Sequence, residues 1–220
     1  MFRLIKWFTE AEARHQGMEN WEVSLPELDA FVGILYVRGA IGGKNLPIDF
    51  LWSEKYGNTF IRETMCRRRF KEIHRFIRFD DKTIRRERLQ TDKFALVSSI
   101  WDRFIDNCLR CYKGGVNLTI DEQLLPSKCR CPITQYMPNK PDKFGIKFWM
   151  LVDAESKYIC NAKPYLGKEE GRPRNEPLGA HVIMTFMEPY IKKGHNVTCD
   201  NFFTSLYLAR QLSKFTLWER

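Results

Sequence analysis

The spacing of apolar residues changes from helical to strand-like near residue 114. In the N-terminal part, Phe31, Val32 and Leu35 lie three, four and seven positions after Leu28. This spacing places them on one face of a helix. The helix is expected to begin after Ser24, a residue type that caps helix N-termini, with a proline in the first turn.

Two further helices are predicted before the change. One covers residues 59–79, and its apolar stripe consists of Phe70, Ile73, Phe76 and Ile77. The other covers residues 94–111, with Leu96, Ile100, Phe104 and Leu109 expected to point inward. Residues 1–113 are therefore expected to form a helical region.

After residue 114, apolar and polar residues alternate as they do in half-buried strands. Strands are predicted at 116–121, 144–152, 158–165 and 195–199, with helices at 178–190 and 205–214. Residues 153–156 form a turn, so that 144–165 is a hairpin. The order of elements predicts an α+β or α/β domain with an antiparallel hairpin over residues 114–220.

Charge is concentrated in one short part of the chain. The protein carries a net charge of +9, and residues 62–88 hold eleven basic and five acidic side chains, a net +6. Such a concentration is typical of a polyanion-binding surface, although a solvated helix face is the alternative. The side chains expected to contact the polyanion on this helix are Arg67, Arg68, Lys71, Arg75 and Arg78.

Composition excludes some classes of protein. No apolar run approaches the ~20 residues that cross a bilayer, and the charged N-terminus does not resemble a signal peptide. The seven cysteines are expected to be reduced thiols. Cys108, Cys111, Cys129 and Cys131 suggest zinc, but a predicted strand separates the two pairs and the second spacing is one residue short. Structural or surface thiols are therefore favoured.

Two aspartates follow short β-branched runs. Asp121 comes after Leu118–Ile120, and Asp200 comes after Asn196–Cys199. Carboxylates at the ends of neighbouring strands are fixed by the sheet, and a pair of Mg²⁺ ions needs such rigid oxygen ligands. An aspartate in this position is also commonly a turn or helix cap, so spacing alone leaves both alternatives open.

Longer motifs around these aspartates closely resemble the transposase domain of the piggyBac family. The resemblance covers essentially residues 20–214. The motifs occur in order at residues 51–53 (LWS), 65–70 (MCRRRF), 75–81 (RFIRFDD), 120–126 (IDEQLLP), 136–141 (YMPNKP), 144–147 (FGIK), 164–167 (PYLG) and 198–205 (TCDNFFTS).

The resemblance implies an RNase H-like catalytic core and DNA transposition through three aspartates that bind Mg²⁺. Asp121 would be the first aspartate and Asp200 the second. The family also implies double-stranded DNA as partner, a nuclear location and no small-molecule cofactor, and it leaves a homodimer open. Residues 1–113 would be a dimerisation or DNA-binding region, and Lys140 and Lys143 would add DNA contacts.

The third aspartate of the family has no match in this sequence. Glu219 is the one acidic residue after Asp200, and it lies in a tail that departs from the family pattern. Glu122 is adjacent to Asp121 on a strand and is expected to point to the opposite face. We therefore expect a truncated or domesticated copy that does not cleave DNA. A non-catalytic DNA-binding relic and an inert fragment are the alternatives.

Overall fold

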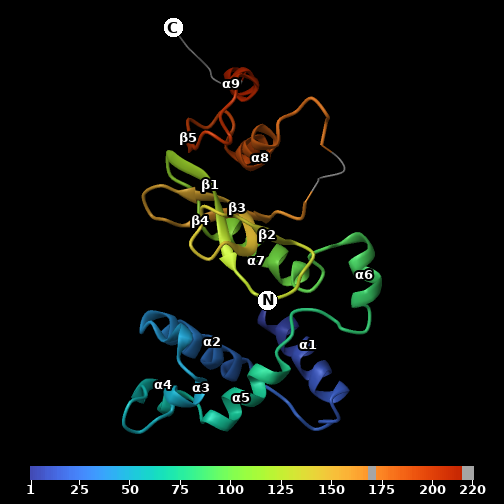
Figure 1. Cartoon of the computed structure of the whole chain (residues 1–220), viewed down its shortest axis with the longest axis vertical. Helices are drawn as coiled ribbons and strands as arrows, with labels where there is room; N and C mark the ends of the chain where they lie inside the picture. The colour runs from blue at the N-terminus through green and yellow to red at the C-terminus, as the bar shows by residue number, and fades with distance from the viewer. Residues whose placement is uncertain (168–171, 215–220) are drawn as a thin grey trace. The chain divides into compact units, whose positions relative to one another are not determined.

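The computed structural model describes residues 1–167 and 172–214, so the predicted tail with Glu219 lies outside the described residues. The chain forms two compact units, Met1–Trp101 and Asp102–Arg220 (Figure 1). The division falls inside a helix, whereas the sequence places the boundary after that helix. Among the described residues, no helix has the length and apolar character needed to cross a membrane.

The first unit is helical, as expected. Its elements are α1 (Phe2–His15), α2 (Leu25–Ala40), the 3₁₀ turn η1 (Gly43–Asn45), α3 (Ile48–Leu51), α4 (Thr59–Thr64), α5 (Arg67–Phe76), α6 (Arg85–Thr91) and the start of α7 (Ser98–Cys111). Helices α1 to α5 and the start of α7 share one core, in which the largest fully buried side chains include Phe31, Phe70 and Phe76.

Helix α2 begins where the sequence predicts. The Ser24 hydroxyl accepts a hydrogen bond from the Glu27 backbone N–H, and the Glu27 carboxylate accepts one from the Ser24 N–H, which forms a capping box. Leu28 and Phe31 are buried as predicted and Val32 packs against the same core, but Leu35 is 39% exposed and Ile34 is buried instead.

The helix predicted over residues 59–79 is two helices, α4 and α5. Met65 and Cys66 between them have extended backbones, and Cys66 is the N-cap of α5. The indole N–H of Trp52 donates to the Met65 carbonyl at 2.8 Å, which satisfies an acceptor that a continuous helix would have bonded internally.

Helix α7 is four residues shorter at its start than predicted, and it turns a different face inward. Ile100 is buried as expected, but Leu96, Phe104 and Leu109 are more than a third exposed. Ile105 and Cys108 are buried instead. The prediction of an inward stripe was therefore correct at one position in four.

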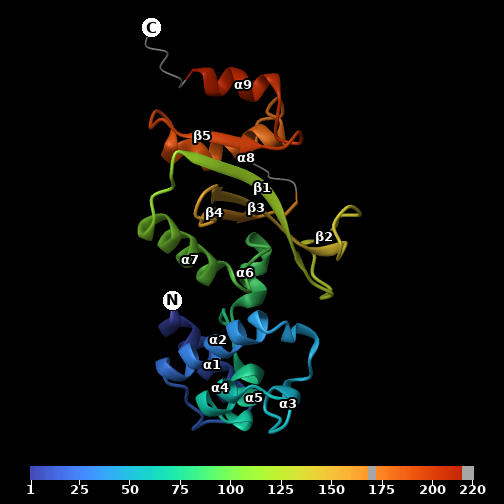
Figure 2. The same ribbon diagram turned by 90° about the vertical axis from the view of Figure 1, so that its left-hand side faces the viewer.

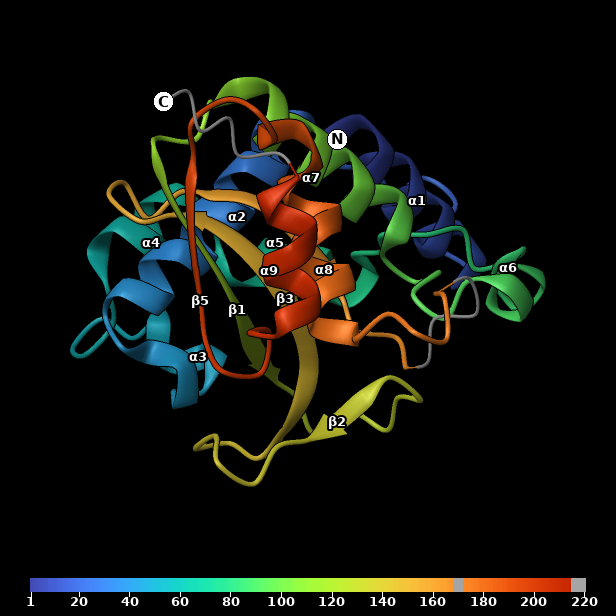
Figure 3. The same ribbon diagram turned by 90° about the horizontal axis from the view of Figure 1, so that it is seen from above.

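The second unit is built on a mixed five-stranded sheet. Its strands are β1 (Asn117–Pro126), β2 (Thr134–Tyr136), β3 (Phe144–Asp153), β4 (Ile159–Pro164) and β5 (Asn196–Cys199). The order is β2-β3-β1-β5, and β4 also pairs with β3. Only β1 and β5 run parallel, and Figure 3 shows β5 beside β1 at the edge of the sheet.

Two helices on one face of the sheet complete the core of this unit. The remaining elements are α8 (Leu178–Met187), η2 (Glu188–Tyr190) and α9 (Leu206–Ser213), and Figure 2 shows α8 and α9 on the side of the sheet opposite α7. Leu118 and Ile120 of β1 and Trp149 and Leu151 of β3 are buried in one cluster with α8. The register pairs Ile120 with Leu151, so these side chains share a face.

Asp153, at the end of β3, holds the start of β1 in place. Its carboxylate is buried and accepts hydrogen bonds from the backbone N–H groups of Ser156 at 2.8 Å, Gly115 at 2.6 Å and Glu155 at 2.9 Å. The Tyr112 hydroxyl also lies within 3.2 Å. The backbone N–H groups of Ser156 and Gly115 hold the pKa of Asp153 well below its usual 3.8.

Replacing Asp153 with asparagine should lower the free energy of unfolding by about 2–3 kcal/mol, because the amide cannot accept from donors on both sides. Urea unfolding measures this change, with the exposed Asp142→Asn as control. Because the folded pKa is depressed, the stabilisation by Asp153 is present above pH ~4 and is lost as the pH falls below that value. A variant as stable as the wild type would show that these hydrogen bonds do not anchor β1.

Candidate functional site

The ends of β1 and β5 bring two carboxylates together. The parallel register pairs Ile120 with Cys199, so Asp121 and Asp200 are the next residues on the two neighbouring strands. One carboxylate oxygen from Asp121, one from Asp200 and one from Glu122 lie within 4.8 Å of one another. The expected side-by-side placement of the two aspartates is therefore present, and both side chains are exposed. We call Asp121, Glu122 and Asp200 the acidic cluster.

Glu122 corrects the expectation that it could not reach this site. The register does pair it with Trp149, which belongs to the face packed against α8. However, β5 ends opposite Ile120, so that among the described residues β1 has no strand partner on that edge from residue 121 onward. The longer glutamate side chain reaches past this open edge to the aspartates.

Local backbone hydrogen bonds orient both aspartates. Oδ1 of Asp121 accepts from the N–H of Glu122 at 2.7 Å, and Oδ1 of Asp200 accepts from the N–H of Phe202 at 3.0 Å. The Asp200 carbonyl also accepts from the N–H of Phe203 and from the hydroxyl of Thr204. These hydrogen bonds fix the turn after β5 and, with it, the position of the Asp200 carboxylate.

The donor set of the cluster fits a hard divalent cation. Mg²⁺ prefers carboxylate oxygens and keeps several waters, so it needs only one or two protein carboxylates on a rigid frame. The strand ends supply two, with Glu122 as a third oxygen donor. In the described part of the chain no other group of three His, Cys, Asp or Glu side chains lies close enough to share an ion, so the four cysteines considered for zinc are not assembled.

Lys140 and Lys143 lie in the loop between β2 and β3. The Lys140 ammonium forms an ion pair with Glu122 at 3.4 Å, so this lysine is placed at the acidic cluster. Lys143 is exposed and has a positive φ of 51°. Of the two predicted DNA contacts, only Lys140 is therefore joined to the cluster by an interaction in the structure.

The basic residues of α5 form ion pairs that the charge pattern does not reveal. Asp49 pairs with Arg67 at 3.5 Å and with Lys71 at 2.5 Å, while Arg68 pairs with Glu72. The Lys71 hydrogen bond lowers the pKa of Asp49. All three basic side chains remain about half exposed or more, so they present charge to solvent even when paired.

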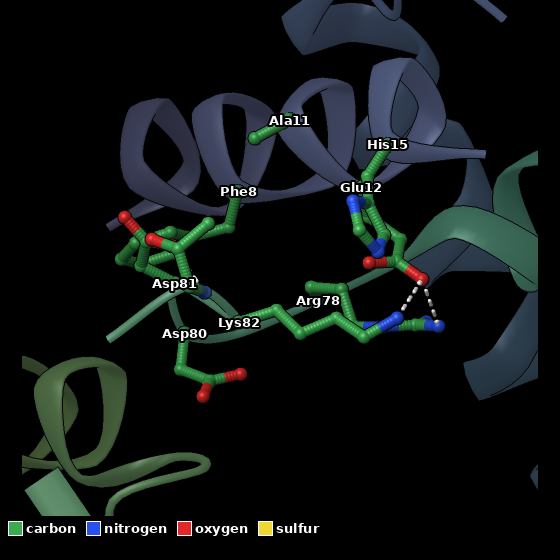
Figure 4. A pocket seen from close by; sticks show the side chains of 9 residues that line it. Phe8, Ala11, Glu12, His15, Arg78, Asp80, Asp81 and Lys82 are labelled. Carbon is green, nitrogen blue, oxygen red and sulfur yellow. Dashed lines mark hydrogen bonds and ion pairs between the residues drawn. The ribbon is translucent and has the colours of Figure 1, made fainter. Parts of the chain in front are cut away.

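Arg75 contacts the C-cap residue of α1, and Arg78 contacts α1 itself. The Arg75 Nε donates to Gln16 at 3.0 Å, and Arg78 forms an ion pair at 2.9 Å with Glu12, whose side chain is 2% exposed. Figure 4 shows Arg78 and Lys82 converging on one oxygen of Glu12 beside a cavity of about 230 Å³. Arg78 therefore has a structural partner that sequence reasoning missed.

Burial opposes ionisation of Glu12, but hydrogen bonds from Gln16 and Lys82 and the charges of Arg78 and Lys82 lower its pKa. A buried carboxylate of this kind is stable only with its cations in place. The position of Glu12 on α1 gave no sequence signal, because its two cationic partners come from a segment about 70 residues away.

A family model described as "Transposase IS4" matches residues 3–217. The human "PiggyBac transposable element-derived protein 3" is 25% identical over 191 residues, which cover 85% of this chain and 32% of that protein. The human "Chimeric ERCC6-PGBD3 protein" is also 25% identical over 191 residues, covering 85% of this chain and 18% of the other. The chain thus spans about a third or less of the length of these relatives.

A solved structure gives the same result for the fold. The "Cryo-EM structure of piggyBac transposase synaptic complex with hairpin DNA" matches with a TM-score of 0.87 and 36% sequence identity. The match covers 96% of this chain and 45% of the other. It confirms the expected helical N-terminal region followed by an RNase H-like mixed sheet.

Proposed function

This chain belongs to the transposase family of the matching model and is a piggyBac-type transposase domain, and from that premise we propose that it binds DNA and holds Mg²⁺ for DNA strand transfer. The observation that carries the proposal is the convergence of Asp121 and Asp200 at the ends of two neighbouring strands. Strand transfer itself is proposed for the whole protein, of which this chain supplies the described site.

In this proposal Asp121 and Asp200 are the metal ligands. Bound divalent ions would neutralise charge on the attacking and leaving phosphate oxygens. The protein's own part is to fix the carboxylates through the sheet and the turn after β5, and to attract the DNA backbone with the basic side chains of α5 and with Lys140 and Lys143. Double-stranded DNA is the proposed partner and the nucleus the proposed location, and a homodimer belongs to the same proposal.

A non-catalytic DNA-binding protein derived from a transposon is the second candidate. The nicking test below separates it from the first candidate. For the 220-residue chain alone we expect DNA binding without cleavage, because two aspartates do not fix both ions against the scissile phosphate.

The test uses a duplex with piggyBac-type terminal repeats in the presence of Mg²⁺ or Mn²⁺. Binding is measured by gel shift and nicking is measured on the same samples, with Asp200→Ala as the control. We expect a shifted complex and no nicking above the control. Absence of a complex would contradict the proposed function. Nicking that disappears in Asp200→Ala would contradict the expected lack of cleavage, and would identify Glu122 or a residue from a second copy as the third ligand.

A further inference from the structure

Lys147, on β3, carries an ammonium group surrounded by aromatic rings. Its Nζ lies 3.8 Å from the ring centroid of Trp149, 5.1 Å from that of Phe202 and 5.9 Å from that of Tyr165. Ring faces attract a cation, so three rings on different segments restrict the position of this ammonium. An unrestrained lysine on a sheet surface would sample many rotamers instead.

The same rings are tied to the acidic cluster. Phe202 lies two residues after Asp200, and its backbone N–H is the donor to the Asp200 carboxylate. Its ring stacks on Trp149 with centroids 5.4 Å apart and an interplanar angle of 19°. Trp149 in turn is the register partner of Glu122. Phe202 and Trp149 therefore contact the Lys147 ammonium and also connect to the residues of the acidic cluster.

Within the part of the chain that the structure describes, the ammonium has charged neighbours but no hydrogen bond to a protein acceptor. Burial lowers the pKa of Lys147 from its usual 10.5, while the charges of Glu122, Asp200 and Asp121 oppose that change and the charge of Lys140 adds to it. None of these carboxylates forms an ion pair with Lys147, nor does any other residue in the described ranges 1–167 and 172–214. Ring faces attract its charge, and each of its three N–H donors can bind an oxygen of solvent or of a ligand.

We infer that Lys147 binds a phosphate oxygen of the DNA backbone next to the acidic cluster, an assignment that rests on the proposed function. The three N–H donors of a half-buried ammonium suit an anionic oxygen, and the carboxylates beside it would bind cations that draw a phosphate to the same place. The aromatic rings hold the ammonium ready at that point before DNA arrives.

The test compares Lys147→Met, which keeps an unbranched chain against the rings, with Lys147→Arg, which keeps the charge. Lys157→Met, in the turn between β3 and β4, is the matched control. Duplex affinity is measured by fluorescence anisotropy over a range of salt concentrations, with Mg²⁺ and again with EDTA. Circular dichroism and the unfolding midpoint establish that each variant is folded.

With Mg²⁺ we expect Lys147→Met to weaken binding about 5–10-fold and to reduce the slope of log affinity against log salt by about 1. Lys147→Arg and Lys157→Met should resemble the wild type. With EDTA the effect of Lys147→Met should shrink, because carboxylates without a cation repel the phosphate.

An unchanged salt slope in folded Lys147→Met would overturn the assignment while leaving the proposed function intact. The assignment would also fail if Lys147→Arg lost as much affinity as Lys147→Met, or if the loss were the same with Mg²⁺ and with EDTA. No DNA binding by the wild-type chain would instead contradict the proposed function, and this inference with it.

Discussion

Replacing Arg67, Arg68 and Lys71 together with alanine should weaken duplex DNA binding about 100-fold at low salt and flatten its salt dependence. Each lysine or arginine that neutralises a phosphate releases a counterion and contributes about 0.9 to the slope of log affinity against log salt. Three lost contacts should therefore reduce the slope by roughly 3, with similar losses for all duplex sequences.

The structure adds a condition to this prediction. Asp49 pairs with Arg67 and Lys71, so it competes with phosphate for two of the three cations. Asp49→Asn should consequently strengthen DNA binding, whereas a helix surface without a role in binding would show no effect.

The matched control replaces Arg3, Lys44 and Lys55 with alanine, which removes the same charge from exposed positions elsewhere in the helical unit. Affinity measured by anisotropy at several salt concentrations should change less for the control than for the α5 triple variant. Equal losses in both would show that net charge alone attracts DNA. Wild-type affinity in the α5 variant would show that this helix face is only solvated.

Replacing Asp200 or Asp121 with asparagine should weaken Mn²⁺ binding about 10–100-fold. Each change removes one anionic oxygen donor from a site where the sheet fixes the ligands, and a neutral amide oxygen is a poorer ligand for a hard cation. Glu122→Gln should cost less, because Glu122 already pairs with Lys140 and comes from the other face of the strand.

Calorimetric titration with Mn²⁺ measures these differences, with Glu155→Gln in the exposed β3–β4 turn as the control. If Asp121→Asn and Asp200→Asn bound Mn²⁺ as tightly as the control, these aspartates would be turn and cap residues only. If Glu122→Gln lost more Mn²⁺ affinity than either aspartate variant, the ion would be bound mainly by Glu122, which would contradict Asp121 and Asp200 as its ligands.

Local signals explain which elements could be predicted from the sequence. The capping residues Ser24 and Glu27 are close together in the sequence and determine where α2 starts. The beginning of this helix could therefore be predicted. The break at Cys66 could not be predicted, because it depends on a hydrogen bond that the indole N–H of Trp52, in a preceding segment, donates to the Met65 carbonyl. Strand β2 was missed because three residues are too few to show a period of two.

The candidate site also has features that the sequence predicts and features that depend on packing. The adjacency of Asp121 and Asp200 followed from two strand ends and from a family resemblance, and neither requires knowledge of side-chain packing. The Glu122 carboxylate lies near the aspartates because β5 ends beside β1 at Cys199. The aromatic rings around the Lys147 ammonium include Phe202, which is placed by the turn after Asp200. The ion pairs of Arg78 and Lys71 involve partners on α1 and α3, which charge counting along the chain cannot find.

A crystal structure of the 220-residue chain soaked with Mn²⁺ tests the central claim most directly, because anomalous scattering locates the ion itself. The account predicts an anomalous peak at the ends of β1 and β5, with Asp121 and Asp200 both as ligands at about 2.0–2.3 Å. A fully soaked crystal in which the peak lies elsewhere, or in which the ion contacts only one of the two aspartates, would contradict it.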